Sequence, residues 1–213
     1  MSGHADTTPR RLPRGRHQLS RETVRSSQRA RIIDAVAEVT AEKGYAGVTV
    51  SDIVRRAGVA KSVFYDLFED KQDCFLAAYD EFVSRLLAAI SDAVPGAGTL
   101  HERYAQGIHA FVAEVVARPA DAQAFVVDVV AAGRPAQLRR AAVLRTFATA
   151  MVTWRDEARE TWPENPPLDE LHALGAVAGM YELLYDALLH GGIAQVRELE
   201  PRLVSVGEAL VGS

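Results

Sequence analysis

Two short apolar patterns separated by one glycine constrain the fold most. They lie in the stretch TVSDIVRRAGVAKSVFYDLFEDK, residues 49–71. Thr49 and Asp52 have the spacing of a capping box, with Asp in place of the usual Glu or Gln, and this predicts a helix start. Gly58 ends that helix, because glycine accepts the positive φ of a tight turn. A second short helix follows at once, and the spacing predicts a helix-turn-helix.

The predicted helix-turn-helix has an inner and an outer face. Lys61 lies at the positive end of the second helix dipole, which favours a phosphate or a base acceptor. The alternative is a generic helical hairpin whose lysine is simply solvated. The inner positions are Ile53, Ala57, Val59, Phe64 and Leu67, and the outer positions are Lys61, Ser62, Tyr65 and Asp66.

Charge is distributed unevenly along the 213 residues. Residues 1–73 carry 13 Lys and Arg against 10 Asp and Glu, and the other 140 carry 11 against 18, which gives the net charge of −4. Residues 1–31 alone hold eight arginines against two acidic residues. This asymmetry indicates a basic module joined to an acidic one, and it favours DNA as a partner of the module.

Helical periodicity accounts for most of the chain. It predicts a first helix from about residue 26 to a C-cap at Gly44, and a long helix from 71 to 94 that Asp70 caps. A Pro-Gly-Ala-Gly break follows at 95–98. Further helices are predicted over 99–118, 120–132, 135–162, 168–190 and 195–211, with Gly191-Gly192 ending the fourth of these five later helices. We predict an all-α fold with a basic flexible arm (1–25), a three-helix DNA-binding module with a helix-turn-helix (26–72) and a larger helical domain (73–213).

The run GYAGVTVSDIVRRAGVAKSVFYDLFEDKQDCFLAAYD, residues 44–80, resembles the DNA-binding domain of the tetracycline-repressor (TetR) family of bacterial transcription regulators. The resemblance implies that the second helix of the motif reads the major groove. Three positions differ from the usual family pattern: Ala60 stands where a capping serine is common, Val63 where Thr or Ser is frequent, and Val54 where a small alanine is usual. The residues that the resemblance places on DNA, most of them on its backbone, are Thr49, Lys61, Ser62, Tyr65 and Lys71.

The larger helical domain is expected to form a homodimer, because one helix-turn-helix reads too few base pairs to find a genomic site. The stripes of the last two helices suit a four-helix interface between protomers, and intramolecular packing of both helices is the alternative. The candidate interface residues are Gly175, Gly179, Leu199, Leu203, Val206 and Leu210.

The family resemblance also implies a small-molecule effector that binds in the larger domain, moves the helix over 71–94 and releases a repressor from a palindromic operator. An apolar or aromatic effector fits the bulky side chains at helical spacing there, for each of which ordinary core packing is the alternative. The candidate ligand-binding residues are Tyr104, His109, Phe111, Phe125, Asp128, Phe147, Met151, Trp154, Met180 and Tyr181.

Other chemistry has little support in the sequence. It contains no catalytic motif, no metal-ligand spacing and no phosphate loop, so we expect no enzyme activity, no cofactor and no metal. Cys74, the single cysteine, lies in an apolar run and is expected to be a buried structural thiol, with redox sensing as the alternative. No apolar run is long enough to span a membrane, and we expect a cytoplasmic protein. The competing function is a helical adaptor that binds a protein partner and has no specific DNA affinity.

Overall fold

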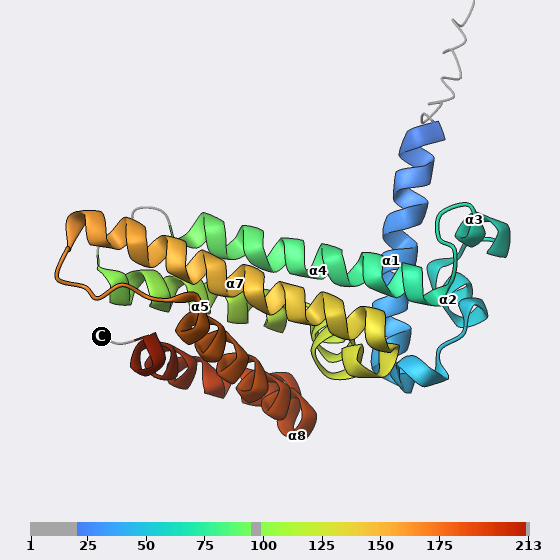
Figure 1. Ribbon diagram of the computed structural model, residues 1–213. Coiled ribbons are helices and arrows are strands. Elements are labelled where there is room, and N and C mark those ends of the chain that lie inside the picture. The colour runs from blue at the N-terminus through green and yellow to red at the C-terminus, as the bar shows by residue number, and fades with distance from the viewer. Residues whose placement is uncertain (1–20, 95–98, 212–213) are drawn as a thin grey trace, which may run out of the picture.

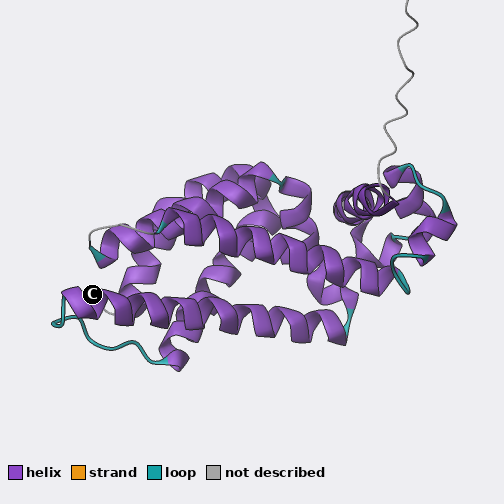
Figure 2. Cartoon of the chain, turned by 90° about the horizontal axis from the view of Figure 1, so that it is seen from above, coloured by secondary structure: helices purple, strands orange, loops and turns teal. Residues whose placement is uncertain are grey.

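The computed structural model describes residues 21–94 and 99–211, and every regular element within those ranges is a helix (Figures 1 and 2). The predicted all-α fold is confirmed. Residues 1–20, most of the predicted basic arm, lie outside the described residues. None of the described helices is long and apolar enough to cross a membrane.

The first three helices form a small module at one end of the molecule (Figure 1). They are α1 (Arg21–Gly47), α2 (Val50–Ala57) and α3 (Lys61–Tyr65). Gly44 has φ 68°, so regular α1 geometry stops at the predicted C-cap, and a short turn leads to α2. Helix α1 begins at Arg21, five residues before the predicted start, because its first turn is polar and gives no hydrophobic period.

Four long helices form the rest of the body: α4 (Lys71–Ala93), α5 (Leu100–Ala117), α7 (Arg134–Thr161) and α8 (Glu170–Val211). The caps predicted for α2 and α4 are present, at Thr49 and Asp70. Helix α8 bends at Gly192, which has φ 61° and ψ −154°, so the predicted end of the helix at Gly191-Gly192 is confirmed. Figure 1 shows the two parts of α8 lying beside each other below α5 and α7.

The stretch predicted as one helix over 120–132 is irregular. It consists of α6 (Pro119–Ala122), a π-helical turn η1 (Gln123–Val127) and a 3₁₀ turn η2 (Asp128–Ala132). Gly133, with φ 87°, separates η2 from α7. This segment packs against α1, so it joins the small module to the long helices.

A single core runs through both parts of the molecule. It contains Ile32 and Val36 of α1, Phe64 of α3 and Phe75 of α4, and it continues to Leu184 of α8. Helix α4 belongs to both parts, since its first turns cross and pack against α1 and its remaining turns pack against α5. The helix that follows the helix-turn-helix is therefore a direct mechanical link to the larger helical domain.

Candidate nucleic-acid interface and ligand pocket

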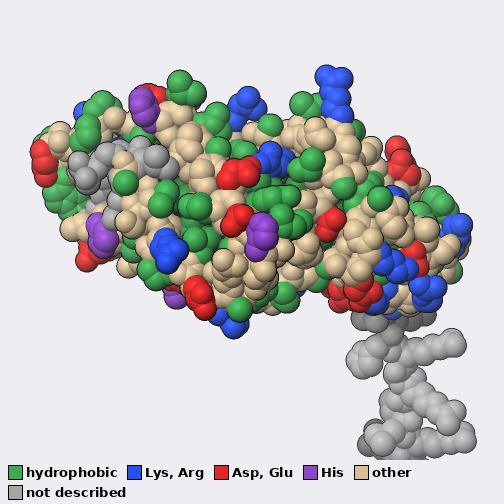
Figure 3. All heavy atoms as spheres, turned by 90° about the horizontal axis from the view of Figure 1, so that it is seen from below, with side chains coloured by type: hydrophobic (Ala, Val, Ile, Leu, Met, Phe, Trp, Pro, Cys, Tyr) green, Lys and Arg blue, Asp and Glu red, His purple; other side chains and the backbone are tan. Residues whose placement is uncertain are grey.

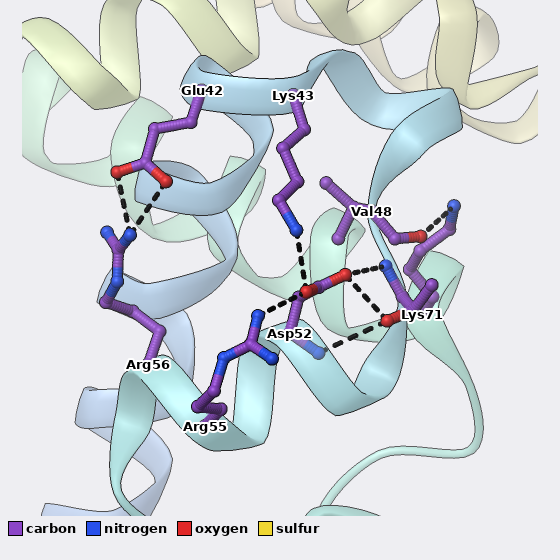
Figure 4. Close-up of polar contacts among 8 residues, drawn as sticks. Glu42, Lys43, Val48, Asp52, Arg55, Arg56 and Lys71 are labelled. Atoms are coloured by element: carbon purple, nitrogen blue, oxygen red, sulfur yellow. Dashed lines mark hydrogen bonds and ion pairs between the residues drawn. The ribbon is translucent and has the colours of Figure 1, made fainter.

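The start of α2 is fixed by a dense polar network (Figure 4). The Thr49 hydroxyl accepts from the Asp52 backbone N–H at 3.2 Å, and the Asp52 carboxylate accepts from the Thr49 backbone N–H at 3.1 Å, which confirms the predicted capping box. Lys43 and Arg55 add ion pairs to the same carboxylate at 2.7 and 2.6 Å. The bonds from Lys43 and Thr49 hold the pKa of Asp52 well below its usual range. The turn between α1 and α2 is therefore rigid.

Helix α3 presents the predicted outer edge to solvent. Lys61 and Ser62 are exposed, and Tyr65 is 53% exposed although it carries a large aromatic ring. The Lys61 ammonium lies 5.9 Å from the centroid of the Tyr65 ring, so the two form one amphipathic patch. Phe64, on the opposite face, is fully buried. Ala60 is the N-cap residue and provides no side-chain cap, as predicted.

Arginines of α1 and α2 hold the helix-turn-helix together. Arg25 donates to the backbone carbonyl of Asp66 at 2.9 Å, where α3 ends. Arg31 donates to the carbonyl of Gly58 at 3.4 Å, in the turn. Arg56 pairs with Glu38 and Glu42 of α1 at 2.8 and 2.7 Å (Figure 4). The orientation of α3 relative to α1 is thus fixed by contacts within the module.

Lys71 has a structural role beside its predicted contact with DNA. Its ammonium donates to the backbone carbonyls of Tyr45 and Val48 at 2.9 Å each, and it lies 4.2 Å from the centroid of the Tyr45 ring. These bonds join the start of α4 to the end of α1. One of the three ammonium protons remains for another acceptor, and a phosphate contact by Lys71 stays a prediction.

On the face drawn in Figure 3, the two ends of the molecule differ in the kinds of side chain that they expose. Basic and acidic side chains lie together around the end that carries the helix-turn-helix, whereas hydrophobic side chains are exposed widely over the long helices. A single exposed lysine on the α3 edge of a module with mixed charges favours contact with DNA through a few positioned cations and gives little general attraction.

The long helices enclose an elongated cavity lined almost entirely by apolar and aromatic side chains. Its empty volume is about 1080 Å³, including the part that opens to solvent. Helix α4 lines it from Tyr79 to Ile90, a rise of about 16 Å at 1.5 Å per residue. Helices α5, α7 and α8 supply the other walls, and Phe125 and Val126 of η1 complete the lining.

Eight of the ten candidate ligand-binding residues line this cavity: Tyr104, Phe111, Phe125, Phe147, Met151, Trp154, Met180 and Tyr181. His109 and Asp128 do not. His109 is exposed and pairs with Glu200 at 2.8 Å. Asp128 accepts a hydrogen bond from the backbone N–H of Tyr45, at the junction with α1. Sequence reasoning placed these two incorrectly among the lining because a polar residue in a helical pattern does not reveal which way it faces.

The α4 wall was missed by the sequence analysis. Its lining residues are Tyr79, Phe82, Val83, Leu86 and Ile90. They recur at steps of three and four, so the period that predicts a buried face was present in the sequence. That period does not separate a face that lines a cavity from one that fills a core.

The irregular segment connects the cavity to the small module. The Phe125 ring lies 5.2, 5.9 and 5.5 Å from the centroids of Phe75, Tyr79 and Phe82 on α4. Tyr181 of α8 donates to the backbone carbonyl of Val126 at 2.7 Å. On the other side, Gln72 of α4 donates to the carbonyl of Ala132 at 2.7 Å. A displacement of the cavity lining at η1 is therefore passed directly to α4 and α1, because both helices contact the η1–η2 segment.

The candidate dimer residues divide into three groups. Gly175 is exposed, and a Cβ added there would meet nothing within 4 Å, while Gly179, Leu199 and Val206 are half-buried. Leu203 is only 2% exposed and lines the cavity, so its assignment to a dimer surface is corrected. The Leu210 side chain lies outside the described part of the chain. Two leucines outside the six candidate interface residues, Leu171 and Leu189, are exposed on the first part of α8.

Cys74 is buried, as expected for a structural thiol. Burial raises its pKa, so the reactive thiolate is scarce at neutral pH. Among the described residues, no group of three or more His, Cys, Asp or Glu has the arrangement of a metal site.

Comparisons with known proteins identify the N-terminal module. Residues 32–78 match the family model described as bacterial regulatory proteins, tetR family. The chain is 29% identical over 114 residues to the transcriptional activator FasR of Mycolicibacterium smegmatis, an alignment that covers 52% of each protein. It is 34% identical over 74 residues to the fatty acid metabolism regulator protein of Bacillus subtilis, covering 35% of this chain and 38% of that protein. The alignments thus span about half or less of these relatives.

Solved structures extend the likeness in fold to the larger helical domain. The transcriptional regulator FadR from Bacillus subtilis, solved in complex with stearoyl-CoA, has a TM-score of 0.74 at 22% identity, covering 86% of this chain and 97% of that one. The fatty acid degradation regulator FadR from Bacillus halodurans has a TM-score of 0.73 at 20% identity, covering 87% and 95%. At these identities the structures establish a shared fold.

Proposed function

We propose that this chain, which belongs to the TetR family of bacterial regulatory proteins, is a homodimeric repressor that leaves a palindromic operator when a fatty-acyl ligand fills its cavity. The observation that carries the proposal is the cavity along α4, because the same helix packs against α1 of the DNA-binding module. A ligand in that cavity is in direct contact with α4, the helix that positions the DNA-binding module.

The shape of the cavity favours a linear acyl chain over a compact aromatic molecule. Its α4 wall is about 16 Å long. A bilayer core is about 30 Å thick, so the acyl chains of one leaflet extend about 15 Å. The two lengths match, and the apolar walls repay the transfer of a hydrocarbon chain from water. The fatty-acid regulators among the similar proteins support the same ligand class.

Release from DNA is proposed to act through α4 and the η1–η2 segment. An acyl chain that presses on Phe125 and Val126 displaces side chains that contact α4. The shift then reaches α1 through Asp128, which bonds the backbone N–H of Tyr45. Ligand binding changes the operator affinity only if the ligand prefers one of two arrangements of this junction.

The first experiment tests DNA recognition. Selection of bound fragments from the host genome identifies the operator, and binding to it is then measured against salt concentration. Lys61→Ala is expected to reduce the slope of log K against log[salt] by about 1, because one phosphate contact is lost. Arg197→Ala, which removes an exposed cation on α8, serves as the control and leaves the slope unchanged. Equal binding by wild type and Lys61→Ala argues against α3 as the reading helix.

The second experiment tests the ligand. Hexadecanoyl-CoA and hexadecanoate are titrated into the protein–operator complex, and each effective ligand raises the thermal midpoint of the free protein by mass action. Release of the operator by either ligand supports the proposal, and tighter operator binding in the presence of ligand would identify an activator.

The adaptor hypothesis predicts no retention of genomic DNA at moderate salt, together with capture of a protein partner.

A further inference from the structure

The cavity contains one polar group that its own walls do not satisfy. Tyr104 of α5 lines the cavity and is 6% exposed. Its hydroxyl is buried, and within residues 21–94 and 99–211 no group forms a hydrogen bond with it. By contrast, the hydroxyl of Tyr181, another lining residue, donates to the Val126 carbonyl. A phenol buried in apolar surroundings normally has a partner, so Tyr104 differs from the rest of the lining.

A buried positive charge acts on this hydroxyl electrostatically. Arg155 of α7 is fully buried, and it follows the lining residue Trp154 and stands one turn after the lining residue Met151. Burial raises the pKa of Tyr104, and the Arg155 guanidinium opposes that rise. The phenol therefore stays protonated near neutral pH and offers a donor. A donor in the field of a positive charge favours a ligand oxygen that carries negative charge or partial charge.

The position of Tyr104 along the cavity defines a direction. Gly107, one turn further along α5, lies beside Ile90, Val94 and Trp154, at the end of α4 away from the small module. Phe125 and Val126 line the opposite end, next to α1. A ligand held by its oxygen at Tyr104 thus extends its hydrocarbon tail toward the DNA-binding module.

We infer that the unpartnered hydroxyl of Tyr104 binds the carbonyl or carboxylate oxygen of an acyl ligand and directs its tail toward η1. The inference rests on the proposed acyl function of the cavity and adds the polar contact and the orientation. Free fatty acid and acyl thioester share the oxygen that the site recognises. Chain length then determines how far the tail reaches toward Phe125, and so how strongly the ligand affects the junction with α1.

The test compares Tyr104→Phe with wild type in binding hexadecanoate, hexadecanoyl-CoA and hexadecane, followed by tryptophan fluorescence, since Trp154 lines the cavity. We expect the variant to lose about tenfold in affinity for the oxygen-bearing probe that the site recognises, because one hydrogen bond to that oxygen is lost. Affinity for hexadecane is expected to be unchanged. The probe that loses affinity identifies free acid or thioester as the natural form.

Matched controls separate this contact from packing. Tyr185→Phe removes a hydroxyl from a half-buried tyrosine of α8 that does not line the cavity, and it is expected to bind all three probes as wild type does. Tyr104→Phe keeps the ring and removes an unsatisfied group, so its thermal midpoint is expected to be equal or higher. A lower midpoint, or an equal loss of affinity for hexadecane, would mean that the hydroxyl supports packing and would overturn the inference.

The remaining outcomes distinguish the two proposals. If wild type binds an acyl probe and Tyr104→Phe binds it equally well, the polar contact is refuted and the acyl function of the cavity stands. If wild type binds none of the three probes, the acyl function itself fails. Operator release by wild type that does not change between octanoyl and hexadecanoyl ligands at saturation would refute the orientation of the tail.

Discussion

At the scale of single residues, Ala60 leaves the reading helix without a side-chain cap. Its backbone is extended, with φ −72° and ψ 151°, as a capping residue requires, but its side chain has no oxygen to accept the Val63 backbone N–H. Helix α3 has only five residues, so one missing cap matters for its local stability. The helix depends on Phe64 packing and on the Arg25 bond to Asp66.

We predict that Ala60→Ser stabilises the protein by about 1 kcal/mol, because the serine hydroxyl caps α3. For a chain of this size the thermal midpoint then rises by about 2–4 °C. Thermal unfolding followed by circular dichroism measures the effect. Ala60→Val is the control, since it adds bulk and no acceptor, and a midpoint gain shared by both variants would contradict the capping explanation.

Asp52 makes the stability of the module depend on pH. Its pKa is lowered in the folded protein, so its contribution to the free energy of unfolding is complete above the ordinary carboxyl pKa of about 4 and is lost as the pH falls through the lower folded pKa. We predict that Asp52→Asn unfolds more easily than wild type at pH 7 and that the difference shrinks below about pH 4. Urea titrations between pH 7 and 3 measure it. A difference that stays constant over this range would exclude the ionised carboxylate as the cause.

At the scale of elements, α8 changes direction at Gly192, whose backbone conformation only glycine adopts without strain. Gly192 combines φ 61° with ψ −154°, and a Cβ added there would meet nothing within 4 Å. The restriction therefore comes from the backbone conformation itself. The bend turns the second part of α8 back along the first, and it brings Leu203 and Gly207 to the cavity.

We predict that Gly192→Ala destabilises the protein by about 1–3 kcal/mol through backbone strain. The measurement is denaturant unfolding. Gly47→Ala is the control, because its added Cβ meets only Lys43 Cβ at an ordinary 3.5 Å and its backbone has no positive φ. If both variants unfold at the same denaturant concentration, the bend at Gly192 does not require glycine.

At the scale of the whole molecule, two leucines are exposed on one side of α8, with Glu182, which pairs with Arg140 of α7, between them. Leu171 is 77% exposed, and Leu189 is also exposed five turns further on, with the small Gly175 and Ala178 on the same side between them. Leucines this exposed on one side of a helix favour a protein contact. We propose a second copy of the chain, paired about a two-fold axis, as the occupant, because the palindromic operator of the proposed function requires one.

We predict that wild type has twice the chain mass of 23.1 kDa in solution. The double variant Leu171→Glu and Leu189→Glu is expected to be monomeric and to lose operator affinity at least tenfold, because the charges are buried unpaired at the interface. Analytical ultracentrifugation and operator binding measure the two effects. Leu138→Glu, at an exposed leucine of α7, is the control and should remain dimeric. A dimeric double variant would place the interface elsewhere.

The helix-turn-helix was largely predictable because its signals are local. The Thr49–Asp52 capping box, the turn at Gly58 and the exposed Lys61 and Tyr65 each depend on residues within a few positions. The same holds for the Asp70 cap and the break at Gly192. Such features express backbone preferences, which the sequence states directly.

The irregular segment and the cavity were decided by tertiary structure. Periodicity predicts one helix over 120–132, but packing of Phe125 against three aromatic rings of α4 accompanies π and 3₁₀ turns there. Leu203 is a second example of what periodicity does not reveal. Its stripe predicts a buried face, and in the structure that face lines the cavity of the same chain. By itself the sequence determined where helices start and end and which faces are apolar, because those depend on neighbours in the chain. Only the tertiary structure decided which apolar face fills the core, lines a cavity or remains exposed, because that depends on helices distant in sequence.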